Sequence, residues 1–380
     1  MIFDTFSLTV GCILLVLAIV TAFISPMLRR PRKTDNDSCD NSEELPSISI
    51  ILAVHDDEEE VERNLPHFLN QKYEGKFEIV VVDESSTDNT TEALKRLKNQ
   101  YANLYTTFIP ESSHYISRRK LALTVGVKAA KYDWILFTNA SCRPGDNNWL
   151  AAMARHATHD TDLVLGGTLY NEHSTDYERF DRIVQWWRQV REAQCRTVYA
   201  YCGRNMMFRR QMFIEGNGFL ASLKYLRGEY DFLANEYGEH HRTSTATEQE
   251  ATLLQDAPNR KTWLNDHLYY IETRKHLSHG FVYSLLVFAD AAALHLNVVA
   301  QVAAIAISSL LQQYSITIVA SASLLLNYAI RVVIGRNAMK DANEDINSWK
   351  IPFMEAFMMW HKLFLIIKHS RCDKYDFIRR

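Results

Sequence analysis

Polar turns that could bind a nucleotide follow three apolar runs of the chain. These turns are His55-Asp56-Asp57, residues 83–88 (DESSTD) and Asn139-Ala140-Ser141. Carboxylates and hydroxyls form hydrogen bonds with ribose and base, and carboxylates also bind hard divalent cations. An acidic turn after a strand is also a common helix N-cap, so each turn alone is weak evidence. Their meaning depends on whether the surrounding elements bring them together.

Short β-branched runs alternate with helical patterns in the first part of the chain. Runs with the composition of buried strands are 47–54 (SISIILAV), 77–82 (FEIVVV), 104–109 and 134–138 (WILFT). Helical periodicity occupies 59–70, 90–101 and 118–131. This alternation predicts an α/β fold with a mostly parallel sheet flanked by helices. Ligands of such sheets bind beyond the carboxyl ends of the strands, so the three polar turns should share one edge.

Composition and missing motifs exclude several classes of protein. The formal net charge of -3 indicates neither a nucleic acid nor a strongly acidic partner. The six cysteines form no CxxC pair and have no metal-like spacing. No GxGxxG or GxxxxGK[ST] follows a strand, which disfavours a dinucleotide-dependent dehydrogenase and a P-loop enzyme.

An uncharged N-terminal segment predicts a membrane anchor over residues 1–28. Residues 6–24 are almost continuously apolar, close to the ~20 residues that a helix needs to cross hydrocarbon. A cleaved signal peptide is disfavoured because Asp4 precedes the apolar run, while Arg29, Arg30, Arg32 and Lys33 follow it. These positive charges place the following chain in the cytoplasm. Residues 29–46 are polar and without periodicity, which predicts a linker.

A second apolar segment predicts a transmembrane helical hairpin over residues 281–335. Residues 291–330 are uncharged and are interrupted near the middle by Gln312-Gln313-Tyr314. A buried helical pair in a soluble domain is the alternative, but the segment lacks a polar stripe. Residues 336–380 are expected to form a cytoplasmic tail, with an interfacial amphipathic helix at 349–368. The chain is therefore predicted to be a multi-pass protein of the inner or plasma membrane with a cytoplasmic catalytic domain.

Five motifs follow one another at residues 80–90, 118–144, 203–219, 228–236 and 272–280. Together they resemble those of membrane-anchored, bacterial-type family 2 glycosyltransferases. The run 80–90 (VVVDESSTDNT) resembles the family's strand and acidic turn, usually V-D-D-x-S-x-D-x-T. Residues 118–144 are similar to the family's lysine-led helix, strand and DxD turn, and residues 203–219 to its acceptor-side segment. Residues 228–236 (GEYDFLANE) are similar to the general-base motif, and residues 272–280 to a basic segment before the membrane. The resemblance implies a GT-A domain over residues 47–280.

The resemblance also implies which residues bind the nucleotide-sugar donor. Asp83 would bind the base or ribose, and Arg274 and His276 would meet the leaving diphosphate. The full implied donor set is Asp83, Glu84, Lys120, Asn139, Ser141, Arg274 and His276.

The metal-binding turn departs from the family pattern. The family's DxD turn binds Mg²⁺ or Mn²⁺, whereas this chain has Asn139-Ala140-Ser141 with neither aspartate. An amide and a hydroxyl replace charged ligands poorly, so Ser141 is only a weak metal ligand. Another acid could supply the metal, cationic side chains could hold the phosphates, or no donor could be used.

The general-base motif departs in the same way. The position aligned with the family's aspartate holds Tyr230, which is a weak base at neutral pH because a tyrosine pKa lies near 10. Asp231 and Glu229 flank it and are the catalytic candidates. On the acceptor side, Asn205 and Trp263 are the candidates, although an aromatic stretch before a membrane helix also suits an interfacial belt.

The resemblance implies a membrane-bound hexosyltransferase that moves a sugar, with inversion, from a nucleotide sugar to a lipid-linked or polysaccharide acceptor at the cytoplasmic face. The altered motifs leave an alternative open, in which the protein is a catalytically inactive scaffold or the subunit of a partner glycosyltransferase.

Overall fold

A computed structural model describes residues 5–29, 31, 45–111 and 117–377 of the chain. Most of the expected linker, residues 30 and 32–44, lies outside the described residues. The chain folds as two compact units. One contains residues 1–30 and 281–367, and the other contains residues 31–280 and 368–380.

A seven-stranded sheet is the centre of the second unit. Its strands lie in the order β3-β2-β1-β4-β8-β6-β9, and β8 alone runs antiparallel to its neighbours. The bounds are β1 Ile48–Val54, β2 Phe77–Asp83, β3 Leu104–Phe108, β4 Trp134–Thr138, β6 Leu163–Gly166, β8 Met206–Arg209 and β9 Thr243–Ala246. The prediction of a mostly parallel sheet is confirmed. The predicted strands 47–54, 77–82, 104–109 and 134–138 are found within one residue at each end.

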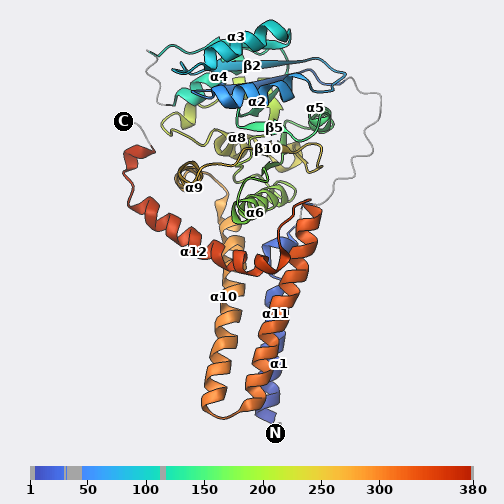
Figure 1. The fold of residues 1–380 in the computed structure, drawn as a ribbon, viewed down its shortest axis with the longest axis vertical. Coiled ribbons are helices and arrows are strands. Elements are labelled where there is room, and N and C mark those ends of the chain that lie inside the picture. The colour runs from blue at the N-terminus through green and yellow to red at the C-terminus, as the bar shows by residue number, and fades with distance from the viewer. Residues whose placement is uncertain (1–4, 30, 32–44, 112–116, 378–380) are drawn as a thin grey trace. The chain divides into compact units, whose positions relative to one another are not determined.

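Helices follow the first strands as the periodicity predicts. They are α2 Glu58–Leu69, α3 Thr90–Gln100 and α4 Arg118–Ala129, and they lie around the sheet in Figure 1. A Cβ on Gly126 of α4 would lie only 2.5 Å from Cγ2 of Ile51, so glycine allows this helix to approach the sheet closely. That approach fixes the first turn of α4 near the carboxyl edge of the sheet.

The polar turns after β1, β2 and β4 do share one edge, because β1 lies between the other two strands. Asp56, with φ +53°, accepts a hydrogen bond on Oδ1 from the backbone N–H of Thr87 at 2.6 Å. Two of the three turns are therefore in direct contact. The hydrophobic core beneath them contains Ile50, Leu52, Ile79 and Leu136.

The rest of this unit contains a second, smaller sheet and further helices. A small sheet has the order β5-β10-β7, with bounds Cys142–Pro144, Leu253–Gln255 and Thr168–Tyr170. The remaining helices of more than one turn are α5 Trp149–Ala154, α6 Asp176–Ala193, α7 Arg210–Glu215, α8 Glu229–Tyr237 and α9 Arg260–Arg274. The C-terminal segment also belongs to this unit: Phe377 is buried against the rings of Tyr269 and His369.

The other unit contains three helices that are long and apolar enough to cross a membrane, counted among the described residues. They are α1 Thr5–Ala22, α10 Gly280–Leu310 and α11 Tyr314–Asp341 (Figure 1). The chain reverses between α10 and α11 at the polar interruption that the sequence shows. Helix α12, Ile351–Ser370, exposes Phe353, Phe357, Trp360 and Phe364, and its expected interfacial position stays a prediction.

A buried ion pair joins α1, α11 and α12. The Arg331 guanidinium donates to Glu355 Oε2 at 2.5 Å and to the carbonyl of Thr21 at 2.6 Å, and Ser25 Oγ donates to Glu355 Oε1 at 2.6 Å. Asn327 accepts from Arg331 Nε at 3.3 Å and donates to the carbonyl of Ala18 at 2.6 Å. Charged groups among apolar helices are costly unless they are paired, and this pair is fully engaged.

Candidate active site

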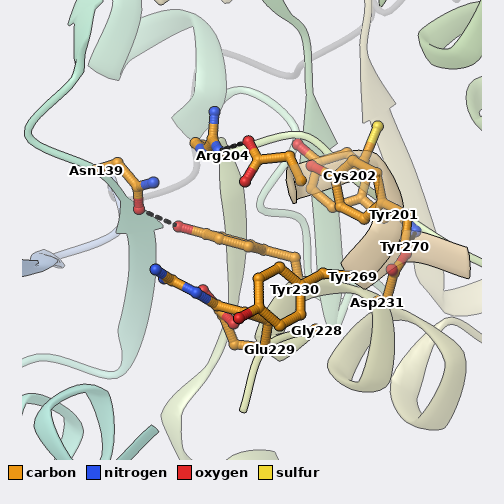
Figure 2. Close-up of a pocket in the computed structure, with 12 residues that line it drawn as sticks. Asn139, Tyr201, Cys202, Arg204, Gly228, Glu229, Tyr230, Asp231, Tyr269 and Tyr270 are labelled. Atoms are coloured by element: carbon orange, nitrogen blue, oxygen red, sulfur yellow. Dashed lines mark hydrogen bonds and ion pairs between the residues drawn. The ribbon is translucent and has the colours of Figure 1, made fainter. Parts of the chain in front are cut away.

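A pocket of about 50 Å³ lies beyond the carboxyl end of β4, between the first turn of α8 and the middle of α9 (Figure 2). Its walls combine four tyrosines and one cysteine with several charged side chains. The lining residues are Asn139, Tyr201, Cys202, Arg204, Arg227, Gly228, Glu229, Tyr230, Asp231, Asp266, Tyr269 and Tyr270. It therefore includes the first residue of the altered DxD turn and the whole start of the altered base motif.

The two altered motifs contact each other through Asn139. Its Oδ1 accepts a hydrogen bond from the hydroxyl of Tyr230 at 3.1 Å, as Figure 2 shows, and a second from Nη2 of Arg119. Arg119 belongs to the first turn of α4, where Ser117 Oγ accepts from the N–H of Lys120 and caps the helix. Asn139, at the first aspartate position of the DxD turn, and Tyr230, at the general-base position, are thus part of one hydrogen-bonded cluster.

Glu229 is the carboxylate that faces this cluster. Its Oε1 accepts from Arg119 Nε at 2.8 Å, while its Oε2 is buried and has no hydrogen-bond partner among the described residues. Burial alone would raise the pKa of Glu229, but the charges of Arg119 and Arg227 outweigh it and hold that pKa below its usual value. Glu229 is therefore ionised at neutral pH and keeps one oxygen for another donor.

Asp231 is turned to the other side of α8. Its Oδ1 accepts from the backbone N–H of Tyr201 at 3.0 Å, and its Oδ2 accepts from Thr273 Oγ1 at 3.1 Å. Burial raises the pKa of this carboxyl above its usual value. Figure 2 shows Asp231 and Asn139 at opposite sides of the pocket. Both oxygens of Asp231 fasten α8 to neighbouring segments.

A glycine sets the direction of these two carboxylates. Gly228 precedes α8 with φ +91°, a conformation that L side chains rarely adopt, and its Cβ would lie 2.5 Å from Cγ2 of Thr273. The sharp entry places Glu229 and Asp231 in the first turn, where the helix dipole favours negative charge. It also turns them to different faces.

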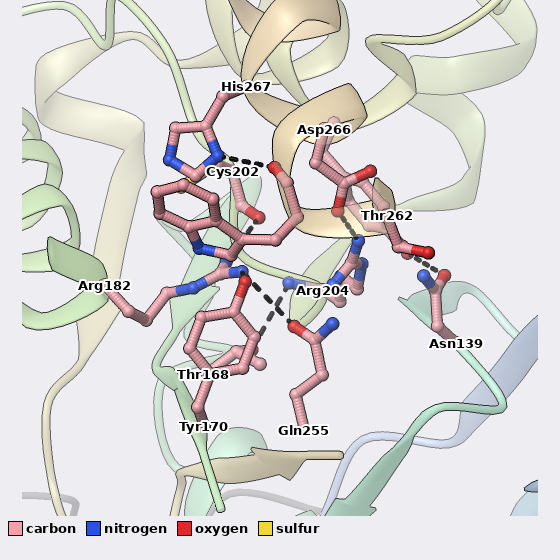
Figure 3. Close-up of polar contacts among 12 residues, drawn as sticks. Asn139, Thr168, Tyr170, Arg182, Cys202, Arg204, Gln255, Thr262, Asp266 and His267 are labelled. Carbon is pink, nitrogen blue, oxygen red and sulfur yellow. Dashed lines mark hydrogen bonds and ion pairs between the residues drawn. The ribbon is translucent and has the colours of Figure 1, made fainter. Parts of the chain in front are cut away.

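Arg204 forms the opposite wall and was not a candidate from the sequence. It donates to Asp266 at 2.8 Å, and its Nη1 is buried with no hydrogen-bond partner among the residues described. Figure 3 shows the layer beside it, in which Arg182 lies over the ring of Tyr170, 4.4 Å from its centroid, and donates to the carbonyl of Cys202 at 3.3 Å. This layer holds the pocket wall in place.

Asp83 and Glu84 lie at the sheet edge, as expected, with different surroundings. Asp83 Oδ1 accepts from the N–H and the hydroxyl of Ser86 at 2.8 and 2.7 Å, and Oδ2 accepts from Thr91 Oγ1 at 2.7 Å. The pKa of Glu84 is raised by burial, against the charges of Arg119 and Arg227. Asp83 shapes the loop after β2, and a nucleotide contact by either residue stays a prediction.

Lys120 has its ammonium group committed elsewhere. Nζ donates to the carbonyls of Ser222 and Tyr225 at 2.7 and 3.0 Å, and it lies over the Phe232 ring at 4.8 Å. The side chain is fully buried, and burial lowers its pKa to about 8. A donor contact by Lys120 would require the ammonium to leave these partners.

Ser141 and its neighbours do not fit a divalent cation. Among the described residues, no three His, Cys, Asp or Glu side chains group closely enough to hold a metal ion. Asn139 Oδ1 already accepts from a guanidinium and a phenol. An amide oxygen beside an arginine supplies no negative charge, whereas protein sites for Mg²⁺ and Mn²⁺ usually include at least one carboxylate.

The remaining candidates lie outside the pocket lining. Arg274 is 3.7 Å from Asp231 Oδ1 and lies over the Tyr270 ring, and His276 stacks on Tyr225 with centroids 4.6 Å apart. Asn205 is fully buried and donates to the carbonyls of Gly167 and Ala251, while Trp263 packs against His267. Tyr269 and Tyr270 line the pocket, whereas the two acceptor candidates Asn205 and Trp263 do not.

Fold and site together define a GT-A type protein with an unusual polar cluster. The mannosyltransferase PcManGT from Pyrobaculum calidifontis, solved in complex with GDP-Man and Mn2+, shares this fold. Its TM-score is 0.55 at 18% identity, and the match covers 92% of this chain and 99% of that one.

Residues 49–216 match the family described as Glycosyl transferase family 2, and they form a domain of that family as the resemblance implies. A segment of 100 residues is 32% identical to the poly-beta-1,6-N-acetyl-D-glucosamine synthase of Staphylococcus aureus (strain COL), covering 26% of this chain and 23% of the relative. Glycosyltransferase AglE of Haloferax volcanii is 27% identical over 36% of this chain and 45% of its own length. The chain therefore matches less than half of these curated relatives.

Proposed function

We propose that this protein is a membrane-bound glycosyltransferase that transfers a hexose, with inversion, from a nucleotide sugar to a polysaccharide or lipid-linked acceptor. The three apolar helices support the membrane location, and the positive charges at Arg29, Arg331 and Arg336 support a cytoplasmic site. The family domain and the polysaccharide-synthesising relative support the reaction class.

One observation carries the catalytic part of the proposal. Glu229 lines the pocket, is ionised and fixed by Arg119, and has no hydrogen-bond partner on Oε2 among the described residues. A general base must be deprotonated and within hydrogen-bond reach of the proton that it removes. Glu229 meets both requirements better than Asp231, whose two oxygens are occupied.

The chemistry is a single displacement at the anomeric carbon. An acceptor hydroxyl gives its proton to Glu229 Oε2 while its oxygen bonds to the anomeric carbon. The bond from that carbon to the donor diphosphate breaks on the opposite side, so the configuration inverts. Tyr269 and Tyr270 suit the acceptor ring, because aromatic faces pack on the apolar faces of sugars.

Turnover by the full-length protein in detergent or lipid nanodiscs tests this function. Donors should include UDP-N-acetylglucosamine and GDP-mannose, with membrane extracts as the acceptor source. Glu229→Gln should lower turnover by about 10²- to 10⁴-fold, the usual range for loss of a general base. Glu236→Gln is the matched control, because Glu236 is exposed on the same helix and outside the pocket lining. Equal turnover by Glu229→Gln and wild type would remove Glu229 from the mechanism.

A second candidate is a non-catalytic nucleotide-binding or glycan-binding subunit. It is favoured by the Tyr230 hydroxyl, which bonds to Asn139 across a pocket that is small for a sugar nucleotide. Nucleotide binding without turnover on any donor, both alone and with a partner transferase from the same membrane, would favour this candidate over catalysis.

A further inference from the structure

We infer that the donor diphosphate is bound by the guanidinium groups of Arg119 and Arg204, so that donor binding does not require a divalent cation. This inference rests on the proposed function, because it names the groups that hold the donor of that reaction. It differs from what the Mn2+ in the Pyrobaculum complex suggests for a protein of this fold.

Arg119 is a resident cation, by which we mean a positive charge fixed between the two altered motifs. Its Nε and Nη2 hold Glu229 and Asn139, which are the polar groups of the two altered motifs. A guanidinium has five N–H donors, so three of them are not used in these two bonds. Its positive charge also acts on Glu84 and Asp57, and its side chain is 15% exposed. A second cation bound to the same oxygens would be repelled by this charge.

Arg204 supplies a buried donor that points to an anionic ligand. The guanidinium is fixed by its pairing with Asp266, and the backbone N–H of Arg204 donates to Thr168 Oγ1 at 3.3 Å. Nη1 remains buried without a partner among the described residues. Leaving a charged N–H buried and unsatisfied is costly. Phosphate oxygens are the geometric match for a guanidinium, because two parallel N–H bonds can form.

A third guanidinium group at the pocket could also bind an anionic ligand. Arg227 is exposed at the pocket and adds a third guanidinium to Arg119 and Arg204. Glu229 and Asp266 face these three groups, whereas Asp231 is turned toward Tyr201 and Thr273. Three guanidinium groups are therefore present at or beside the pocket before any metal ion is considered.

Calorimetric titration of the full-length protein with UDP and with GDP tests the inference. Each titration is run with excess EDTA and again with excess Mn²⁺, and the dissociation constants should agree. Arg204→Gln should weaken nucleotide binding in EDTA by about 10- to 100-fold, the value of a hydrogen bond to a charged group. Arg96→Gln is the control, since Arg96 is exposed on α3 and pairs with Glu62 away from the pocket.

A reciprocal variant makes the test sharper. The double substitution Arg119→Ala and Asn139→Asp removes the resident cation and restores a carboxylate, so nucleotide binding should become dependent on Mn²⁺. If Arg204→Gln does not fold, as judged by circular dichroism, Arg227→Ala at the exposed position should still weaken binding.

The outcomes separate the two ideas. Nucleotide binding by wild type that requires Mn²⁺ would overturn the arginine assignment and leave the glycosyltransferase proposal standing. Absence of binding to both nucleotides under both conditions would count against the proposed function itself. Equal binding with EDTA and Mn²⁺, lost in Arg204→Gln, supports both.

Discussion

Two buried arginine–glutamate pairs serve the two units of this protein differently. In the helical unit, Arg331 and Glu355 are 2.5 Å apart, and their side chains are 1% and 4% exposed. At the pocket, Arg119 and Glu229 are 2.8 Å apart, with 15% and 8% exposure. The chemistry of the two pairs is the same, so their difference lies in what surrounds them.

We call the helical pair closed, because its side-chain oxygens and nitrogens all have hydrogen-bond partners. We call the pocket pair open, because an oxygen of its glutamate has none among the described residues. Both oxygens of Glu355 accept hydrogen bonds, and Arg331 donates through all three of its nitrogens. At the pocket, Glu229 Oε2 and the nearby Arg204 Nη1 have no partner among the described residues. A closed pair stabilises the packing of helices, and an open one is prepared for a ligand. The following changes test that distinction.

The largest effect is expected for Arg331→Met. Removing one member of a buried ion pair leaves an uncompensated charge, so the free energy of unfolding should fall by about 3–5 kcal/mol. Thermal unfolding in detergent measures it. Arg336→Met is the control, because Arg336 is exposed on the same helix. The double variant with Glu355→Leu should recover most of the loss, since a matched apolar pair is tolerated. No loss in Arg331→Met would contradict the closed-pair interpretation.

The next effect is expected for Lys120→Met, which changes the residue that follows Arg119 in the first turn of α4. Lys120 Nζ donates to the carbonyls of Ser222 and Tyr225, so its removal takes away two hydrogen bonds from a buried site. The free energy of unfolding should fall by roughly 2–3 kcal/mol. Nucleotide affinity, measured below the unfolding temperature, should stay at the wild-type value. A large loss of affinity without a loss of stability would instead restore the donor role predicted from the sequence.

The sequence predicted the sheet edge well because its signals are local. The strands β1, β2 and β4 are short buried runs, and the turns after them can be read directly from the residue order. The two altered motifs were also visible. Their physical contact was not, because Arg119, Asn139 and Tyr230 come from three separate segments of the chain.

The directions of individual side chains could not be predicted in the same way. Asn205 and Arg204 are neighbours, yet Asn205 turns into the core and Arg204 turns into the pocket. Glu229 and Asp231 lie on one helical turn, and the left-handed Gly228 together with Thr273 and Tyr201 decides which of them faces the ligand side. These choices depend on tertiary contacts. A motif alone does not record them.

A smaller effect, dependent on pH, is expected for Glu192→Gln on α6. Like Glu229, Glu192 has a buried Oε2 without a partner in the described structure, but it does not line the pocket. Burial raises its pKa to about 7, against the charge of Arg196. The folded state therefore holds this proton more tightly than the unfolded state, so the stability contributed by Glu192 falls as pH rises from about 4.5 to 7.

Thermal unfolding of Glu192→Gln and wild type at acid and alkaline pH checks this prediction. The variant should match wild type near pH 5 and be more stable by about 1–3 kcal/mol near pH 8, where the wild-type carboxyl is charged. A difference of the same size at both pH values would mean that Glu192 is not the titrating group. The expected result would mean that a carboxylate oxygen without a hydrogen-bond partner indicates a ligand site only where a cation such as Arg119 keeps the carboxylate ionised.

The smallest effect is expected for Tyr230→Phe. The change removes one hydrogen bond to Asn139 and keeps the ring, so the free energy of unfolding should fall by only about 0.5–1.5 kcal/mol. Asn139 retains its bond from Arg119, so the cluster persists. If the phenol acts only as a wall of the pocket, turnover and nucleotide affinity should change by less than about tenfold, which corresponds to 1.4 kcal/mol. A loss of turnover as large as that of Glu229→Gln would instead place the Tyr230 hydroxyl in the reaction, and the pocket pair could no longer be described by Glu229 alone.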